Sequence, residues 1–255
     1  MGSAPTTLET ADGIRLAARW WEPASATGDA VVVVHGFAAR KDQPAVQEVA
    51  RHLVAAGHSV LTYDSRGHGE SGGLCTLGEL ERVDVDAAVA AARDHADRVV
   101  VVGTSMGGVA VLNHMAANGG ITDGAGAQGA VVVATPARWE IPRTLRGAAS
   151  VMITQTGPGR VMAARRFQTR LAVRPERGDP PVERICLVGK PVAVVHGLAD
   201  RFLPPAAATA LFTAAREPRR LELVPGMGHG FCAAALRPVE SAVAWAMRTA
   251  PAGTV

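Results

Sequence analysis

Short runs of uninterrupted apolar residues, rich in valine, alternate with segments of helical periodicity along this 255-residue chain. The runs that predict strands cover residues 30–34, 59–63, 98–102, 129–134 and 191–196, and a more polar run follows at 220–224. A strand that is apolar throughout is typical of a parallel sheet with helices on both faces. The pattern therefore predicts an α/β fold, preceded by a hairpin over residues 7–21 that turns at Asp12-Gly13.

The segments between the predicted strands indicate amphipathic helices, because their apolar residues recur at helical spacing. The first helix starts at Gln43 and ends at Gly57, and the second covers residues 77–96. The residues expected to face the sheet are Val46, Val49, Ala50, Leu53 and Val54 in the first helix, Leu80, Val83, Ala87 and Ala91 in the second, and Leu236, Val239, Val243 and Met247 in the last.

Residues 137–190 interrupt this alternation and predict a small helical cap, inserted into a single domain that spans residues 1–255. Within the cap, Ala163, Phe167 and Leu171 share a helical face that follows the helix breaker Gly157-Pro158-Gly159. Counted from Pro136 to Lys190, the segment holds eleven basic and four acidic residues, so its net charge is +7 in a chain of net charge +3. We expect the cap to lie over the ends of the strands, where ligands of such sheets bind.

The valine run that starts at residue 98 continues into Gly103-Thr104-Ser105-Met106-Gly107, a Gly-x-Ser-x-Gly motif that leads into an apolar helix. A serine at such a corner has a strained backbone, and Gly103 and Gly107 let the strand and the helix approach closely. The hydroxyl of Ser105 is then exposed beside the first free N–H groups of the helix, including that of Met106. A second copy of the motif, around Ser71, lies in a polar loop with no strand leading in. Ser105 is therefore the predicted nucleophile.

Five motifs that follow predicted strands occur in one order along the chain. They are His35-Gly36-Phe37, Asp64-x-Arg66-Gly67-x-Gly69, Gly103-x-Ser105-x-Gly107, His196-Gly197-x-x-Asp200 and Gly228-His229-Gly230. With these motifs the sequence resembles the α/β-hydrolase family over nearly its whole length, the cap excepted. The resemblance implies an eight-stranded, mostly parallel sheet flanked by helices, and a catalytic triad in the order Ser105, Asp200, His229.

These residue types suit acyl transfer by a serine. The imidazole of His229 can take the proton of Ser105 as the hydroxyl attacks a carbonyl carbon, and can later protonate the leaving group. Asp200 would accept a hydrogen bond from the other ring N–H of His229 and hold its tautomer. The oxyanion would be bound by the backbone N–H of Met106 and, by the resemblance, by that of Phe37.

Several other residues compete for these roles. Asp64 is better explained as a partner of Arg66 in its own loop, and Asp123 lies in a glycine-rich loop, so Asp200 is the preferred triad acid. In the family, the positions of His35 and His68 are mostly structural. The remaining histidines on or beside predicted helices are expected to be hydrogen-bonded or solvated: His52, His58, His95 and His114.

Composition argues against several other classes of protein. A net charge of +3 favours neither nucleic acid nor membrane binding, and no apolar run approaches membrane-spanning length. The three cysteines, Cys75, Cys186 and Cys232, lie far apart without the spacing of a zinc site. We therefore expect a cytoplasmic enzyme with reduced thiols and without a metal ion or an organic cofactor.

The motifs leave three hypotheses for the reaction, because this fold supports many activities. The H-G-F-x-x-x-K-D run from His35 to Asp42 is similar to that of small-cap carboxylesterases, which implies hydrolysis of a small acyl ester. The basic cap motivates a second hypothesis, a thioesterase acting on thioesters of coenzyme A or of an acidic acyl-carrier protein. The third is a non-hydrolytic cyclase or lyase, or a ligand-binding protein, on the same scaffold. Serine at position 105 and the absence of a cap tyrosine argue against an epoxide hydrolase.

Overall fold

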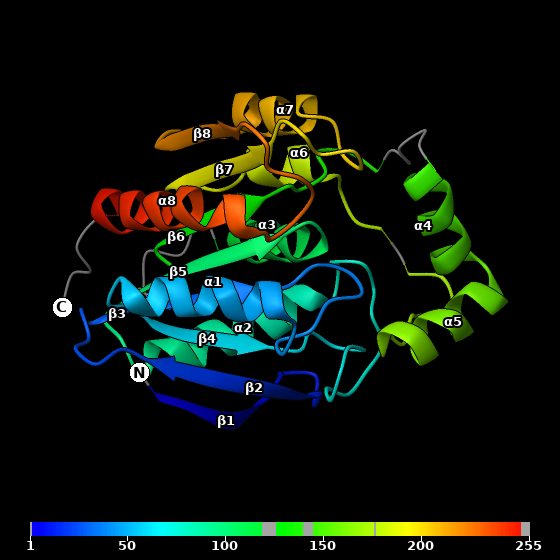
Figure 1. Ribbon diagram of the computed structural model, residues 1–255, viewed down its shortest axis with the longest axis horizontal. Helices are drawn as coiled ribbons and strands as arrows, with labels where there is room; N and C mark the ends of the chain where they lie inside the picture. Colours follow the sequence, from blue (N-terminus) through cyan, green and yellow to red (C-terminus); the bar gives the residue numbers. More distant parts are fainter. Residues whose placement is uncertain (1, 119–125, 140–144, 176, 251–255) are drawn as a thin grey trace.

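A computed structural model describes residues 2–118, 126–139, 145–175 and 177–250 (Figure 1). Its centre is an eight-stranded sheet in the order β1-β2-β4-β3-β5-β6-β7-β8. The strands are β1 (Gly2–Glu9), β2 (Arg15–Glu22), β3 (Asp29–Val34), β4 (Ser59–Tyr63), β5 (Arg98–Thr104), β6 (Gly129–Val133), β7 (Val192–Gly197) and β8 (Arg219–Val224). The pairs β1-β2 and β2-β4 are antiparallel and the others are parallel. The predicted α/β-hydrolase sheet and its leading hairpin are confirmed, although β1 starts earlier than expected.

Two hydrophobic cores, one on each face of the sheet, explain the uninterrupted valine runs. Along β3, Val32 and Val34 pack into one core, whereas Val31 and Val33 pack into the other. Successive side chains of a strand point to opposite faces, so a strand covered on both sides needs an apolar residue at every position. Each fully buried valine of this kind contributes about 1.5 kcal/mol or more.

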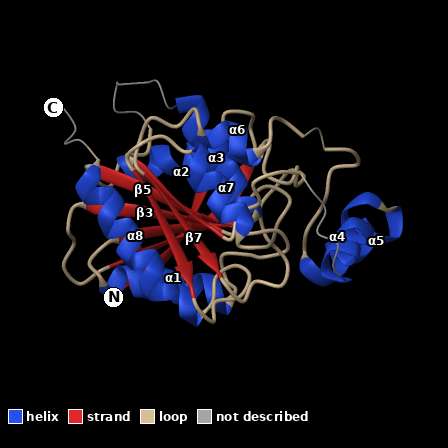
Figure 2. Ribbon diagram, turned by 90° about the horizontal axis from the view of Figure 1, so that it is seen from above, coloured by secondary structure: helices blue, strands red, loops and turns tan. Residues whose placement is uncertain are grey.

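Helices cover both faces of the sheet. One face carries α1 (Pro44–Ala55) and α8 (Leu236–Thr249), the latter preceded by the 3₁₀ turn η1 (Ala233–Ala235). The other face carries α2 (Glu81–Arg93), α3 (Met106–Asn118), α6 (Pro181–Ile185) and α7 (Ala206–Ala214) (Figure 2). The faces predicted for the first and last helices are confirmed, since those positions are buried or packed against the core. Within the described residues, no helix has the length and apolar character needed to cross a bilayer.

The helix predicted over residues 77–96 is shorter than expected and turns a different face to the sheet. Its predicted face was wrong, because Leu80 is exposed and Val83, Ala87 and Ala91 are only partly buried. The buried side chains are those of Glu81, Asp84, Val85, Ala88, Val89 and Ala92. Two of these buried residues are acidic, so the apolar periodicity of the sequence does not identify this face. Asp84 accepts hydrogen bonds from Arg66, and Glu81 accepts them from the loop before the helix.

The cap segment, of which residues 140–144 and 176 lie outside the described part, contains helices in two different places. The helices α4 (Leu145–Gln155) and α5 (Gly157–Phe167) stand apart from the sheet layers (Figures 1 and 2), whereas α6 packs against α3 and α7. The helix break predicted at residues 157–159 lies just before them, at Thr156 between α4 and α5; residues 157–159 themselves form the first turn of α5, where proline is tolerated. Thr156 caps this turn by accepting a hydrogen bond from Gly159 N. Because α5 ends at Phe167, Leu171 does not share its face.

Candidate active site

Ser105 lies at the corner between β5 and α3. Its φ is +53°, in the left-handed region that residues other than glycine rarely adopt. A Cβ atom at Gly103 would overlap the backbone of Gly107, and one at Gly107 would lie 2.5 Å from the carbonyl oxygens of Val34 and His35. Glycines at both positions therefore permit the close approach of β3, β5 and α3 that holds Ser105 in its strained conformation.

The structure brings together three side chains that are far apart in the sequence. Asp200 follows β7, His229 follows β8, and both reach the end of β5 where Ser105 lies. His229 Nε2 is 3.1 Å from Ser105 Oγ, and His229 Nδ1 is 2.8 Å from Asp200 Oδ2. The side chain of Asp200 is inaccessible to solvent, whereas that of His229 is 22% exposed. A hydrogen-bonded chain thus runs from a buried carboxylate through an imidazole to a hydroxyl.

Asp200 is held by groups that the sequence analysis did not single out. Its Oδ1 accepts hydrogen bonds from the backbone N–H groups of Phe202 at 2.7 Å and Leu203 at 2.9 Å. Burial opposes the charge of Asp200, but hydrogen bonds from His229 and from these backbone groups outweigh it and lower the pKa of the carboxyl. The ring of Phe202 also meets the His229 ring edge to face, with 4.9 Å between their centroids. An aspartate that begins a turn commonly binds N–H groups just ahead of it, a signal that could have identified these contacts.

Phe37 and Met106 line the same cavity as Ser105 and His229. Met106 is the first residue of α3, so its backbone N–H has no acceptor in a preceding helical turn. Phe37 follows β3, and none of the described groups accepts a hydrogen bond from its backbone N–H. The adjacent Gly36 lies close to the nucleophile strand, because a Cβ atom there would be 3.2 Å from Thr104 O. Neither N–H group is therefore engaged by another group of the described residues.

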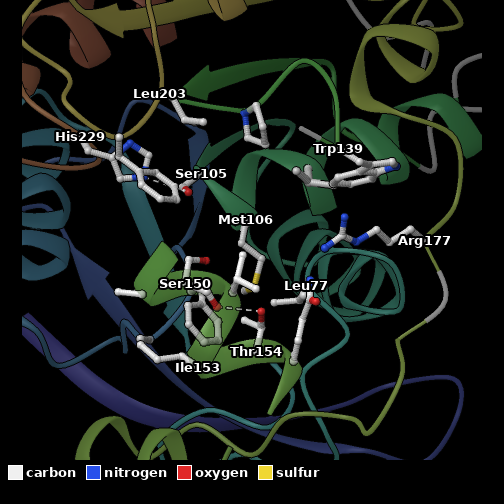
Figure 3. A pocket seen from close by; sticks show the side chains of 18 of the residues that line it. Leu77, Ser105, Met106, Trp139, Ser150, Ile153, Thr154, Arg177, Leu203 and His229 are labelled. Carbon is white, nitrogen blue, oxygen red and sulfur yellow. Dashed lines mark hydrogen bonds between the residues drawn. The ribbon is translucent and has the colours of Figure 1, made fainter. Parts of the chain in front are cut away.

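Ser105 and His229 open into a cavity of about 440 Å³ beneath the cap. Much of its wall is apolar, with contributions from Phe37, Leu77, Met106, Val109, Ile153 and Phe167. The wall also includes Trp139 and Arg177, and the Arg177 guanidinium lies 5.7 Å from the centroid of the Trp139 ring. Figure 3 shows this pair on the far side of Met106 from His229. The cavity therefore combines an apolar space next to Ser105 with a cationic group farther away.

The sequence of this chain is similar to those of known proteins. A family model described as "Serine aminopeptidase, S33" matches residues 25–182. The chain belongs to this α/β-hydrolase family. An uncharacterized protein of Mycobacterium tuberculosis, Rv2307c, is 31% identical to this hydrolase over 228 residues, which are 87% of this chain and 70% of that protein.

Solved structures of low sequence identity share the fold of this hydrolase. The esterase Pf2001 of Pyrococcus furiosus has a TM-score of 0.72 at 18% identity, covering 98% of this chain and 91% of that one. The esterase RhEst1 of Rhodococcus sp. ECU1013 has a TM-score of 0.67 at 20% identity, covering 97% and 99%. Structural similarity at such low sequence identity establishes the fold alone, because one fold supports many substrates.

The rival serine of this hydrolase has a structural role. Ser71 is buried; its Oγ donates a hydrogen bond to Asp64 O at 2.5 Å and accepts one from Ala17 N at 2.9 Å. The contacts tie the polar loop to β2 and to the residue that follows β4. The structure therefore leaves Ser71 no access to the cavity that contains Ser105.

The rival aspartates are also accounted for, with one correction. Asp64 does not bind Arg66; it accepts hydrogen bonds from Lys41 N at 2.7 Å and Lys41 Nζ at 3.0 Å. Arg66 instead binds Asp84 and Asp12. The H-G-F-x-x-x-K-D run thus supplies a buried lysine that fixes the loop around Asp64, while Asp123 lies outside the described residues.

His35 and His68 lie away from the hydrogen-bonded chain. His35 Nε2 accepts a hydrogen bond from Ser65 N at 3.0 Å, and His68 Nδ1 lies 3.0 Å from Arg66 O. Burial lowers the pKa of both imidazoles to about 4, so both rings are neutral at neutral pH. His196 lies closer to the site, with Nε2 3.2 Å from Leu203 O and 3.6 Å from Asp200 Oδ2. His196 therefore supports the turn that presents Asp200.

Three other histidines contact neighbouring side chains. His52 lies 2.6 Å from Glu240, and His114 lies 2.5 Å from Asp86. His95 stacks on Trp20 with 4.4 Å between the ring centroids. In the described part of the chain, no group of three or more His, Cys, Asp or Glu side chains could hold a metal ion, and the cysteines are free thiols.

Proposed function

We propose that this protein is a serine esterase that hydrolyses small acyl esters through an acyl-enzyme on Ser105. The observation that carries the proposal is the contact chain of 2.8 Å from Asp200 to His229 and 3.1 Å from His229 to Ser105. Membership in a hydrolase family and the strained backbone of Ser105 support the same conclusion.

In the proposed acylation step, His229 Nε2 takes the proton of Ser105 as Oγ attacks the ester carbonyl carbon. The carbonyl oxygen becomes an oxyanion, which the backbone N–H groups of Phe37 and Met106 would stabilise by roughly 3 kcal/mol each. When the tetrahedral intermediate collapses, the bond from carbon to the alcohol oxygen breaks. His229 gives its proton to that oxygen, and Ser105 is left as an acyl ester.

In the proposed deacylation step, water takes the place of the departed alcohol. His229 removes a proton from this water as its oxygen attacks the acyl carbon, and Ser105 Oγ then leaves and recovers the proton. Asp200 stabilises the imidazolium in both steps. The hydrogen bonds that lower the pKa of Asp200 keep it charged, as this role requires.

The cavity supports an apolar acyl group as the part of the substrate next to Ser105. Leu77, Val109 and Ile153 offer the hydrocarbon surface there, and each buried CH₂ of a ligand gains about 0.8 kcal/mol. We therefore expect kcat/KM for p-nitrophenyl esters to rise as the acyl chain grows from acetate, until the chain fills the cavity.

The test is hydrolysis of p-nitrophenyl esters combined with labelling by a fluorophosphonate probe. Ser105→Ala should abolish labelling and lower kcat by about 10³-fold or more, because the nucleophile is gone. Ser71→Ala, which removes the serine of the second Gly-x-Ser-x-Gly motif, is the matched control and should still label. Labelling of folded Ser105→Ala, or its absence in the folded natural protein, would contradict the proposal.

A thioester is the second candidate substrate, favoured by Arg138 and Arg177 in the wall of the cavity. Basic side chains there would attract the phosphates of coenzyme A or the acidic surface of an acyl-carrier protein. Comparing kcat/KM for p-nitrophenyl esters and for thioesters with the same acyl group separates the two. A preference for the thioester of less than about tenfold would remove this candidate. Failure of Ser105 to react with the probe would instead favour a non-hydrolytic cyclase or lyase, or a ligand-binding protein.

A further inference from the structure

A second cavity, of about 490 Å³, adjoins the catalytic cavity beneath the cap. The two cavities share part of their walls, namely Leu77, Thr154, Gln155 and Arg177. The rest of the second wall comes from Arg160, Val173, Arg174 and Pro175. Among the described residues, this wall therefore holds three arginines and no carboxylate.

The basic residues of the cap differ in what they contact. Arg170 donates a hydrogen bond to Ser71 O, and Arg184 pairs with Asp179 at 3.3 Å. By contrast, no carboxylate of the described residues pairs with Arg160, Arg174 or Arg177. Among the described residues, the positive charge around the second cavity is thus not neutralised by a carboxylate.

Arg177 marks the boundary between the two cavities. Its guanidinium lies 5.7 Å from the centre of the Trp139 ring, and such stacking favours a planar cation over an aromatic face. Figure 3 shows Arg177 beside Trp139, well away from Ser105 and His229. A ligand that reaches from Ser105 past Leu77 would therefore meet apolar surface first and positive charge afterwards.

We propose that the second cavity is an anion subsite, and that the substrate carries a carboxylate or phosphate at its end remote from the bond that is cleaved. The inference rests on the proposed function, since it assigns the subsite to a substrate held at Ser105. Guanidinium groups bind both kinds of anion through paired N–H donors. The apolar wall between the subsite and Ser105 would hold the hydrocarbon that joins the anion to the ester.

The size of the effect follows from the exposure of the arginines. Arg160 is partly buried, and Arg174 and Arg177 are exposed, so water and salt screen their charges. Exposed ion pairs of this kind contribute modest free energies, which correspond to about 1.5- to fivefold in affinity for each arginine. A subsite built from three of them should discriminate by about tenfold or more at low ionic strength.

The experiment compares matched p-nitrophenyl monoesters of dicarboxylic acids, with the far carboxylate either free or capped as a methyl ester. We expect kcat/KM to be about tenfold higher for the free carboxylate at low salt, and this ratio to fall towards one at about 0.5 M NaCl. Arg160→Gln and Arg174→Gln should each lower the ratio about threefold. Arg165→Gln and Arg166→Gln, on the exposed part of α5 and in neither cavity wall, are the matched controls and should leave it unchanged.

Two further arms identify the anion and separate this inference from the proposed function. Acyl-CoA thioesters, compared with neutral thioesters of the same acyl group, test whether the anion is a phosphate. A higher kcat/KM for acyl-CoA that falls in Arg160→Gln and Arg174→Gln would support the subsite as well as a carboxylate preference does. Calorimetry can also measure how tightly Ser105→Ala binds the compounds with a free far carboxylate and those with a methylated one. This measurement needs no hydrolysis. Equal binding of the two acids and no preference for acyl-CoA would overturn the subsite, even if Ser105 labels normally. A preference that all four arginine variants lower equally would also overturn it.

Discussion

At the scale of single residues, the backbone of Ser105 is held in a conformation that costs free energy. The left-handed backbone conformation costs a non-glycine residue about 1 kcal/mol or more of conformational free energy relative to glycine. Ser105 adopts this conformation, with φ of +53°. The fold holds it there because β3, β5 and α3 meet around Gly103 and Gly107 with no room for a Cβ atom. Under the proposed function, stability and activity thus oppose each other at this residue.

Two substitutions at residue 105 measure this strain. Ser105→Gly should raise the free energy of unfolding by about 1 kcal/mol relative to Ser105→Ala, because alanine keeps the Cβ atom and glycine does not. Both variants should be inactive, so activity cannot confuse the comparison. Urea unfolding of the two proteins provides the measurement, and an alanine variant at least as stable as the glycine variant would refute the strain.

A second prediction at this scale concerns the charge of Asp200. Asp200→Asn keeps the shape of the side chain but removes its charge and favours the wrong tautomer of His229, so kcat should fall by about 10³-fold or more. Stability should change far less than activity, since the backbone N–H groups of Phe202 and Leu203 can still bind the amide oxygen. Steady-state kinetics and urea unfolding of the same preparation would check both parts. A fall in kcat of less than tenfold would show that Asp200 is not the triad acid.

At the scale of elements, the start of α2 shapes the cavity beside Ser105. The carboxylate of Glu81 accepts hydrogen bonds from Thr76 N at 2.7 Å, Thr76 Oγ1 at 2.6 Å and Gly78 N at 2.8 Å. These contacts hold the intervening Leu77, whose φ is +63°, in the wall of the cavity. An acidic residue on the buried side of a helix thus positions an apolar residue that lines the cavity.

Removing this carboxylate should loosen the loop. Glu81→Ala leaves the buried Gly78 N and two partly buried donors of Thr76 without their acceptor, so we expect it to lower the free energy of unfolding by about 2 kcal/mol. It should also raise KM for p-nitrophenyl esters, since Leu77 is no longer held. Glu48→Ala, on the exposed side of α1, is the control and should change stability by less than about 0.5 kcal/mol. Equal losses in the two variants would contradict the role of Glu81.

At the scale of the whole molecule, buried neutral histidines make the folded state sensitive to acid. Burial lowers the pKa of His35 from 6.5 to about 4. Between these two values the unfolded chain binds a proton that folded His35 does not bind, so stability rises with pH through this window and is lost as pH falls. His68, whose pKa is also lowered to about 4, acts in the same direction.

The free energy of unfolding should therefore fall between pH 7 and pH 4. His35 should account for about 3 kcal/mol of this loss at pH 4. Urea unfolding at a series of pH values measures this slope. His35→Gln should reduce the slope, because the titrating group is removed, whereas His95→Gln replaces an exposed histidine and serves as the control. The same slope in both variants and the natural protein would refute the assignment.

The sequence by itself determined the sheet, the strained corner at Ser105 and the order of the motifs. These features are local: the four consecutive valines of β3 reflect the two cores, and Gly103 and Gly107 reflect a turn that excludes Cβ atoms. Strand positions could therefore be predicted to within a few residues. The strong α/β pattern also placed Ser105, Asp200 and His229 at one edge of the sheet, because the ends of parallel strands meet there.

Only the tertiary structure decided which charged residues are buried together and which face a ligand. The buried side of α2 carries Glu81 and Asp84, whose partners lie in other segments, so periodicity misplaced that face by one residue. Asp64 binds Lys41 across the fold rather than its neighbour Arg66. Among the many cap arginines, position in space alone selects those around the second cavity. A side chain's partner is set by distances between remote segments, and those distances arise only once the chain has folded.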